Sequence, residues 1–184
     1  MPVHIKSHWR ERDRPRPLKE VAGALAYIAW RLALDKAITL HGENFVYESD
    51  LQRLGVIAEY LAFQTQIADR LAHDSLNEEE RRLFVTTLAY RLAEHFQDNA
   101  QDLLGSGDHR QTFLDLFNRR SMEYAEFQLT QEGPSYPFLR HLGYEIQLLM
   151  GVSEKNRWVI DQVMDRDGGD LYRRFRRALE DLFE

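Results

Sequence analysis

Apolar side chains recur along this chain at intervals of three and four positions, the spacing that brings them to one face of an α-helix. The clearest stripe is the last one, formed by Leu171, Phe175, Ala178, Leu179 and Leu182. No stretch of useful length alternates apolar and polar residues in the manner of a half-buried strand. The pattern therefore predicts an all-α fold, a helical bundle.

Prolines and glycines divide this pattern into about seven helices. The five prolines lie at positions 2, 15, 17, 134 and 137, so none interrupts residues 18–133. Four long helices are expected there, over 18–42, 50–73, 77–104 and 108–131. Three shorter helices are expected over 136–150, 153–164 and 171–183, with a turn at 167–170 before the last.

We expect a basic, flexible N-terminal arm over residues 1–17, followed by a single helical domain over residues 18–184. The domain divides into a first hairpin (18–75), a second hairpin (76–133) and a C-terminal helical extension (134–184). The spacing of the predicted helices along the chain favours this division into three parts.

The two hairpins share a sequence pattern that suggests an internal duplication. Leu-Ala-Tyr at 25–27 recurs at 88–90, an offset of 63 residues, and Glu-Tyr-x-x-Phe-Gln at 59–64 recurs at 123–128, an offset of 64. Matches between amphipathic helices also arise by chance, because all such helices favour the same residue types, among them Leu, Ala, Tyr and Glu. A true duplication predicts a four-helix bundle with the extension packed over it.

The repeated glutamates, Glu59 and Glu123, need hydrogen-bond donors if they are buried. In an antiparallel hairpin the hydroxyl of Tyr27 comes to the depth of Glu59, and that of Tyr90 to the depth of Glu123. Such pairs would be polar sites in the bundle or structural hydrogen bonds. The alternative is that both glutamates face solvent.

Composition narrows the chemistry that this chain can perform. It contains no cysteine among 184 residues, which excludes disulfides, thiol catalysis and Cys-based zinc sites and leaves His, Asp and Glu as strong metal ligands. The formal net charge is −6, opposite in sign to the surface of a dedicated nucleic-acid binder. Because no signal peptide or membrane-length apolar run is visible, we expect a cytoplasmic protein without a membrane partner.

A duplicated hairpin resembles the ferritin-like carboxylate metal proteins in architecture alone, because their Glu-x-x-His motif does not occur in this chain. Other carboxylates and histidines offer substitutes, and His141 and Glu145 are one helical turn apart. The candidate ligands of a divalent metal are Glu59, Glu123, His95, His141 and Glu145. The competing interpretation of these residues is exposed charges, with histidines bonded to neighbouring carboxylates.

A helix-turn-helix is a weaker alternative. The segment around Gly151 has the general form of its turn, but Gln147 stands where a small residue is needed and Arg157 where an apolar one is needed. An arginine cluster at 173–177 is followed by acidic residues. We therefore expect no nucleic-acid partner, and a DNA-binding regulator is the least favoured function.

The sequence lacks the glycine-rich phosphate-binding loops and the Gly-x-Ser-x-Gly nucleophile motif. These absences favour a non-enzymatic interaction or regulatory module that self-associates, as a homodimer, with no cofactor and with a further protein partner of unspecified kind. The alternative is a metal-binding or small-ligand-binding helical enzyme that uses the five candidate ligands.

Overall fold

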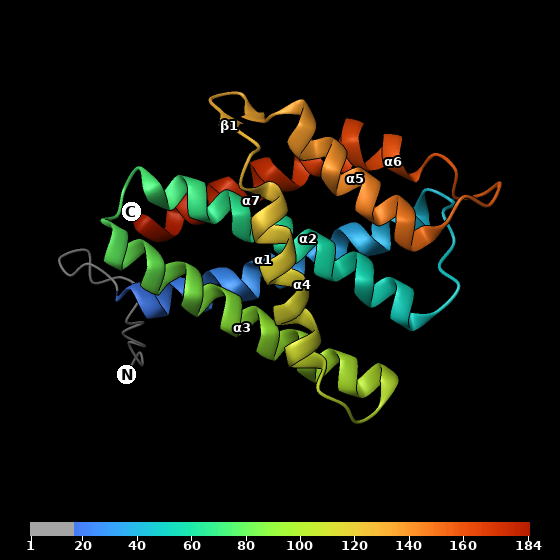
Figure 1. The fold of residues 1–184 in the computed structure, drawn as a ribbon, viewed down its shortest axis with the longest axis horizontal. Coiled ribbons are helices and arrows are strands. Elements are labelled where there is room, and N and C mark those ends of the chain that lie inside the picture. Colours follow the sequence, from blue (N-terminus) through green and yellow to red (C-terminus); the bar gives the residue numbers. More distant parts are fainter. Residues whose placement is uncertain (1–16) are drawn as a thin grey trace, which may run out of the picture.

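A computed structural model describes residues 17–184 and confirms the predicted all-α fold (Figure 1). The predicted arm, up to residue 16, lies outside the described residues. The long helices are α1 (Leu18–Gly42), α2 (Asp50–His73), α3 (Glu78–Leu104) and α4 (His109–Tyr124). They are followed by β1 (Leu129–Thr130), β2 (Gly133–Pro134), α5 (Tyr136–Met150), α6 (Val159–Gln162), a π-helical turn η2 (Val163–Asp167) and α7 (Gly168–Phe183).

Local capping chemistry sets several of these helix boundaries. The Ser49 hydroxyl accepts a hydrogen bond from the backbone N–H of Gln52 at the start of α2. Asn77 and Glu80 form a reciprocal capping box at the start of α3, which satisfies two backbone donors that the helix itself leaves free. These boundaries match the sequence-based ones to within one residue.

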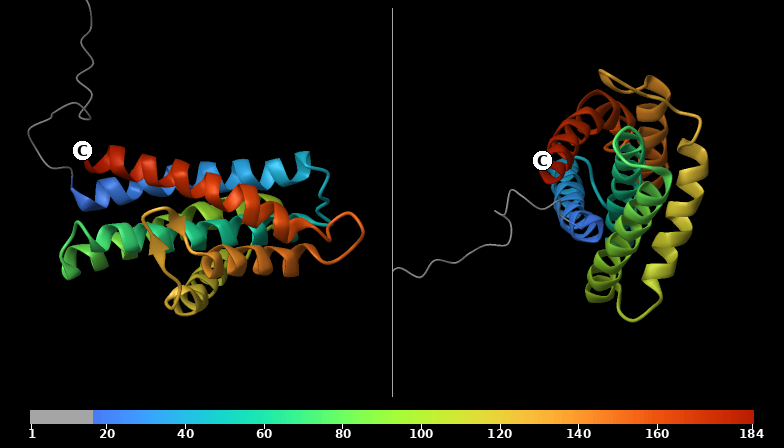
Figure 2. Two further views of the ribbon diagram at one scale, coloured as in Figure 1. Left: turned by 90° about the horizontal axis from the view of Figure 1, so that it is seen from above. Right: turned by 90° about the vertical axis from the view of Figure 1, so that its left-hand side faces the viewer.

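Helix α2 occupies the centre of the bundle. Every residue from Val56 to Ala68 is buried, because α2 contacts α1, α3, α4, α5 and α7. Helix α7 lies alongside α1 (Figure 2), and α4 crosses the other long helices at a steep angle (Figure 1). The steep crossing brings the last turn of α4 against both α2 and the following α5.

The fourth helix is shorter than predicted, since it ends at Tyr124 rather than near residue 131. The guanidinium of Arg70 on α2 donates to the backbone carbonyls of Tyr124, the last residue of α4, and of Phe127, just beyond its end. The chain then forms the two-residue strands β1 and β2, paired antiparallel. Gly133 takes a φ of +134° where the ring of Tyr172 packs against it.

The predicted turn at 167–170 is wrong. Gly168 has helical angles (φ −63°, ψ −46°), and the chain passes from α6 through η2 into α7 without a break. Glycine serves close packing here, because a Cβ on Gly168 would lie 2.7 Å from Leu139 of α5. Gly143 of α5 is equally crowded, with Ile160 and Met164 at 3.0 Å from a built Cβ.

Neither the count of seven helices nor the duplicated hairpin is confirmed. Within residues 17–184 there are six helices when α6, η2 and α7 are taken as one. Equivalent positions of the proposed repeat have different surroundings: Leu40 is fully buried and Leu103 is 45% exposed. Glu59 lies in the middle of α2, whereas Glu123 lies in the last turn of α4.

None of the helices described for residues 17–184 has both the length and the apolar character needed to cross a lipid bilayer.

Candidate metal centre

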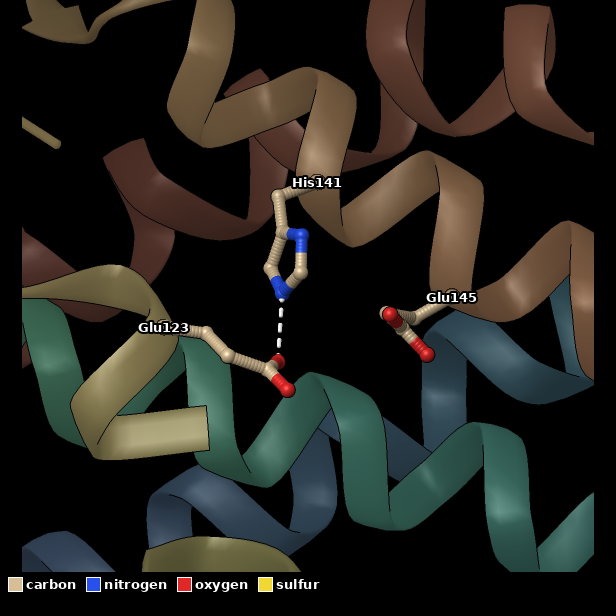
Figure 3. Close-up of side chains that lie close together, drawn as sticks. All are labelled: Glu123, His141 and Glu145. Atoms are coloured by element: carbon tan, nitrogen blue, oxygen red, sulfur yellow. Dashed lines mark hydrogen bonds and ion pairs between the residues drawn. The ribbon is translucent and has the colours of Figure 1, made fainter. Parts of the chain in front are cut away.

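Four of the five predicted ligands come together where α2, α4 and α5 meet. Glu59 comes from α2, Glu123 from α4, and His141 and Glu145 from α5. Potential ligand atoms of Glu123, His141 and Glu145 all lie within 4.8 Å of one another. Figure 3 shows the three side chains directed into the same space, with His141 Nε2 at 2.8 Å from Glu123 Oε2.

The fifth predicted ligand, His95, lies elsewhere. Its ring packs against the rings of Tyr27 and Trp30, with centroid separations of 6.4 and 6.2 Å. It belongs to the contact between α1 and α3, so it is not part of the cluster that contains His141.

The predicted tyrosine–glutamate pairs are wrong as well. Tyr27 and Tyr90 are both exposed, and the guanidinium of Arg110 lies over the Tyr90 ring. Both glutamates have Arg120 as their donor instead.

Arg120 is the residue that the sequence interpretation missed, and it lies at the centre of the cluster. Its Nε and Nη2 donate to the two carboxylate oxygens of Glu59, each at 2.8 Å. Nη1 donates to Glu123 at 2.8 Å, and Nη2 donates also to Glu145 at 2.6 Å. One guanidinium therefore holds three carboxylates from three helices. Its i, i+3 spacing to Glu123 was the one local signal of this role.

Together, Glu59, Arg120, Glu123, His141 and Glu145 form a cluster of side chains that is partly closed to solvent. The side chains of Arg120 and Glu59 are only 8% and 3% exposed. Glu123 is the most open member, at 34%. An ion could therefore approach from the Glu123 side, while the Glu59–Arg120 pair closes the inner side.

Burial and hydrogen bonding shift the pKa values of the individual residues of the cluster in different directions. Burial raises the pKa of Glu59, although the hydrogen bonds from Arg120 oppose this. For Glu123 burial also acts upward, but the hydrogen bonds from His141 and Arg120 prevail and lower its pKa. The pKa of Arg120 is raised despite its burial, because Glu59 accepts from it. Glu123 and Arg120 are therefore ionised at neutral pH.

Tyr124 contributes an unsatisfied polar atom to this region. It is fully buried and its hydroxyl has no hydrogen-bond partner among the described residues. Burial raises its pKa, the negative charge of Glu59 acts in the same direction, and the positive charge of Arg120 opposes them. Its ring meets the edge of the His141 ring at a centroid separation of 4.9 Å. A buried hydroxyl without a partner is costly, so a missing hydrogen-bond partner is expected near it.

The charges of the cluster do not balance internally. With all three carboxylates ionised, Arg120 supplies the one fixed positive charge, which leaves two negative charges when the His141 imidazole is neutral. Protons or a divalent cation would neutralise the remainder.

The available donors match particular ions. One imidazole nitrogen and two carboxylates suit Mn²⁺, Fe²⁺ or Zn²⁺, whereas Mg²⁺ and Ca²⁺ favour oxygen ligands alone. Metal–ligand bonds of about 2.1 Å place neighbouring ligand atoms roughly 3.0–3.4 Å apart. Side chains whose atoms spread over as much as 4.8 Å would therefore move inward around an ion.

A second buried polar cluster lies on the other side of α2. The Asp167 carboxylate, in the π-helical turn, accepts long hydrogen bonds from Gln162 (3.3 Å) and Tyr60 (3.5 Å). Burial raises the pKa of Asp167, against the opposing charge of Lys36. Lys36 itself pairs with Asp170. These contacts join α1, α2 and α7.

The arginine cluster at 173–177 is largely neutralised by acidic neighbours. Arg174 binds Asp35 at 2.7 Å and Arg176 binds Glu180 at 2.7 Å, and Arg173 lies 3.7 Å from Asp170.

No protein-family profile, curated protein or solved structure shows significant similarity to the chain.

Proposed function

We propose that this protein binds a divalent transition-metal cation at Glu123, His141 and Glu145. The observation that carries the proposal is the convergence of an imidazole and two carboxylates from α4 and α5 within 4.8 Å. Three protein ligands leave coordination positions open, as in metal sites that also hold water or a substrate.

The unpaired hydroxyl of Tyr124 supports a ligand beyond the side chains themselves. A buried water molecule, bound either to an ion or to the protein alone, would give this hydroxyl the partner that it lacks. His141 Nε2 and Glu123 Oε2 lie 2.8 Å apart, so an ion that displaces the proton between them would meet two ligand atoms at once.

Replacing His141 by alanine is expected to weaken Zn²⁺ or Mn²⁺ binding about a hundredfold or more, because it removes the nitrogen ligand. Isothermal titration calorimetry of the purified, chelator-treated protein measures the affinity. His95→Ala is the matched control, because it removes a histidine that lies outside the cluster. Equal affinity in wild type and His141→Ala, or no binding by the wild type, would contradict the proposal.

Self-association is a second candidate, supported by apolar side chains exposed at the end of α5. Val152 is 82% exposed, Leu148 60% and Trp158 58%. The surrounding charged residues carry both signs, so two copies could pair opposite charges around an apolar centre. These charged residues are Glu154, Lys155, Arg157 and Asp161. The occupant that we propose for this surface is a second copy of the chain.

Introducing a charge at this surface is expected to break the dimer. Val152→Asp should shift the protein from dimer to monomer in sedimentation equilibrium, because a buried unpaired carboxylate is costly at an interface. Ile38→Asp, at a similarly exposed position of α1, should leave the mass unchanged. A wild-type protein that is monomeric at all concentrations would refute self-association.

A further inference from the structure

Arg120 occupies the same carboxylates that the proposed metal ion needs. Its Nη1 and Nη2 donate to Glu123 at 2.8 Å and to Glu145 at 2.6 Å. Of the five N–H groups that a guanidinium carries, four donate hydrogen bonds to the three glutamates. A metal ion that binds these two carboxylate oxygens must displace Arg120 from them.

We infer that Arg120 is an internal cation that competes with metal ions and thereby sets which ions the site accepts. The inference rests on the proposed metal-binding function and names its specificity determinant. A positive charge a few ångströms from a bound divalent ion opposes its binding in a partly buried site. Weakly bound ions are therefore excluded first.

The Glu59 carboxylate can keep its hydrogen bonds to Arg120 when Arg120 releases the carboxylates of Glu123 and Glu145. Both of its oxygens accept from Arg120 at 2.8 Å, and it is almost completely buried. Arg120 can release Glu123 and Glu145 and still keep a bidentate partner, so the exchange leaves no buried charge without a partner. Glu59 is thus a positioning residue for the competitor rather than a metal ligand.

The nature of the ligands decides which ions overcome this competition. Mg²⁺ and Ca²⁺ bind chiefly through oxygen, and the two carboxylate ligands are the groups that Arg120 holds. Zn²⁺ and Mn²⁺ also gain the His141 nitrogen, to which Arg120 makes no bond. Competition from Arg120 lowers the affinity for every ion, so the ions that also gain the imidazole nitrogen are those that still bind tightly.

The double substitution Glu59→Leu with Arg120→Leu tests this inference. Removing both members of a buried ion pair together preserves folding better than removing one, and circular dichroism verifies the helix content. We expect the Zn²⁺ and Mg²⁺ affinities in calorimetry each to rise at least about tenfold, because Glu123 and Glu145 no longer accept hydrogen bonds from Arg120 while the net charge of the remaining ligands is unchanged. Asp69→Leu with Arg81→Leu, a bidentate pair outside the cluster, should change neither affinity.

Arg120→Lys provides a second variant that keeps the charge but not the planar two-nitrogen geometry, and its Zn²⁺ affinity should rise less than that of the double variant. A double variant that binds Zn²⁺ no more tightly than a metal-binding wild type would overturn the inference and leave the proposed function standing. If only the double variant binds, Arg120 competes with every ion successfully, and the proposed function of the natural chain is overturned. Binding by neither would overturn both.

Discussion

Replacing Arg120 alone by leucine should lower the free energy of unfolding by about 3–5 kcal/mol, the usual cost of breaking a buried ion pair by removing one partner. Glu59, which is 3% exposed at its side chain, would lose both hydrogen-bond donors. Glu123 and Glu145 would at the same time lose the charge that offsets their repulsion. Three helices would be held less firmly at their junction.

Urea unfolding monitored by circular dichroism measures this loss. The second substitution Glu59→Leu should restore most of the lost stability, because it removes the stranded carboxylate. Arg81→Leu is the control: its bidentate pair with Asp69 has similar distances of 2.7 and 2.9 Å but is more exposed. It should cost no more than about 1 kcal/mol. Equal losses at Arg81 and Arg120 would show that burial of the pair is unimportant.

Phe138→Ala should cost about 3–5 kcal/mol, as is typical for removing a fully buried aromatic ring. Phe138 is fully buried, and its ring lies 5.3 Å from that of Phe63 on α2 and 4.9 Å from that of Tyr124 on α4. The guanidinium of Arg70 lies 4.9 Å from the Phe138 centroid. The ring therefore packs among α2, α4 and α5, and it lies three residues before His141 on α5.

The thermal midpoint and the urea midpoint of Phe138→Ala both report this change. Tyr136→Ala, two residues earlier on α5 and 68% exposed, is the matched control and should change stability by less than about 0.5 kcal/mol. Because Phe138 supports the α5 turn that carries His141, its loss should also weaken metal binding. A variant as stable as the control would mean that the neighbouring rings close the cavity.

Much of the helical layout could be predicted from the sequence because it depends on local chemistry. Caps such as Ser49 and Asn77 act within one turn, so the boundaries of α2 and α3 follow from neighbouring residues. The end of α4 does not, because Arg70 binds the carbonyls of Tyr124 and Phe127 from 54 and 57 positions away. The misplaced turn at 167–170 has a similar cause: Gly168 allows the close approach of α5, which no local pattern reveals.

In the candidate site, too, the part that depends on neighbouring residues could be predicted from the sequence, and the part that depends on distant contacts could not. His141 and Glu145 were recognised as a pair because one turn of helix separates them. Glu59 and Arg120 are 61 positions apart, and only the crossing of α2 by α4 brings them together. Residue type alone could not separate His141 from His95, since both are helical histidines near acidic residues. Their difference lies in which helices pack against them.

The connection between α4 and α5 gains a further property from the position of the cluster. Glu123 and His141 are 18 residues apart in the chain, one just before and one just after the segment that contains β1 and β2. An ion held by both would act as a removable cross-link that closes this segment into a ring. Closing a ring of this size reduces the conformational freedom of an opened chain, as a disulfide does. In a protein without cysteine, reversible coordination would then fasten the two halves of the bundle.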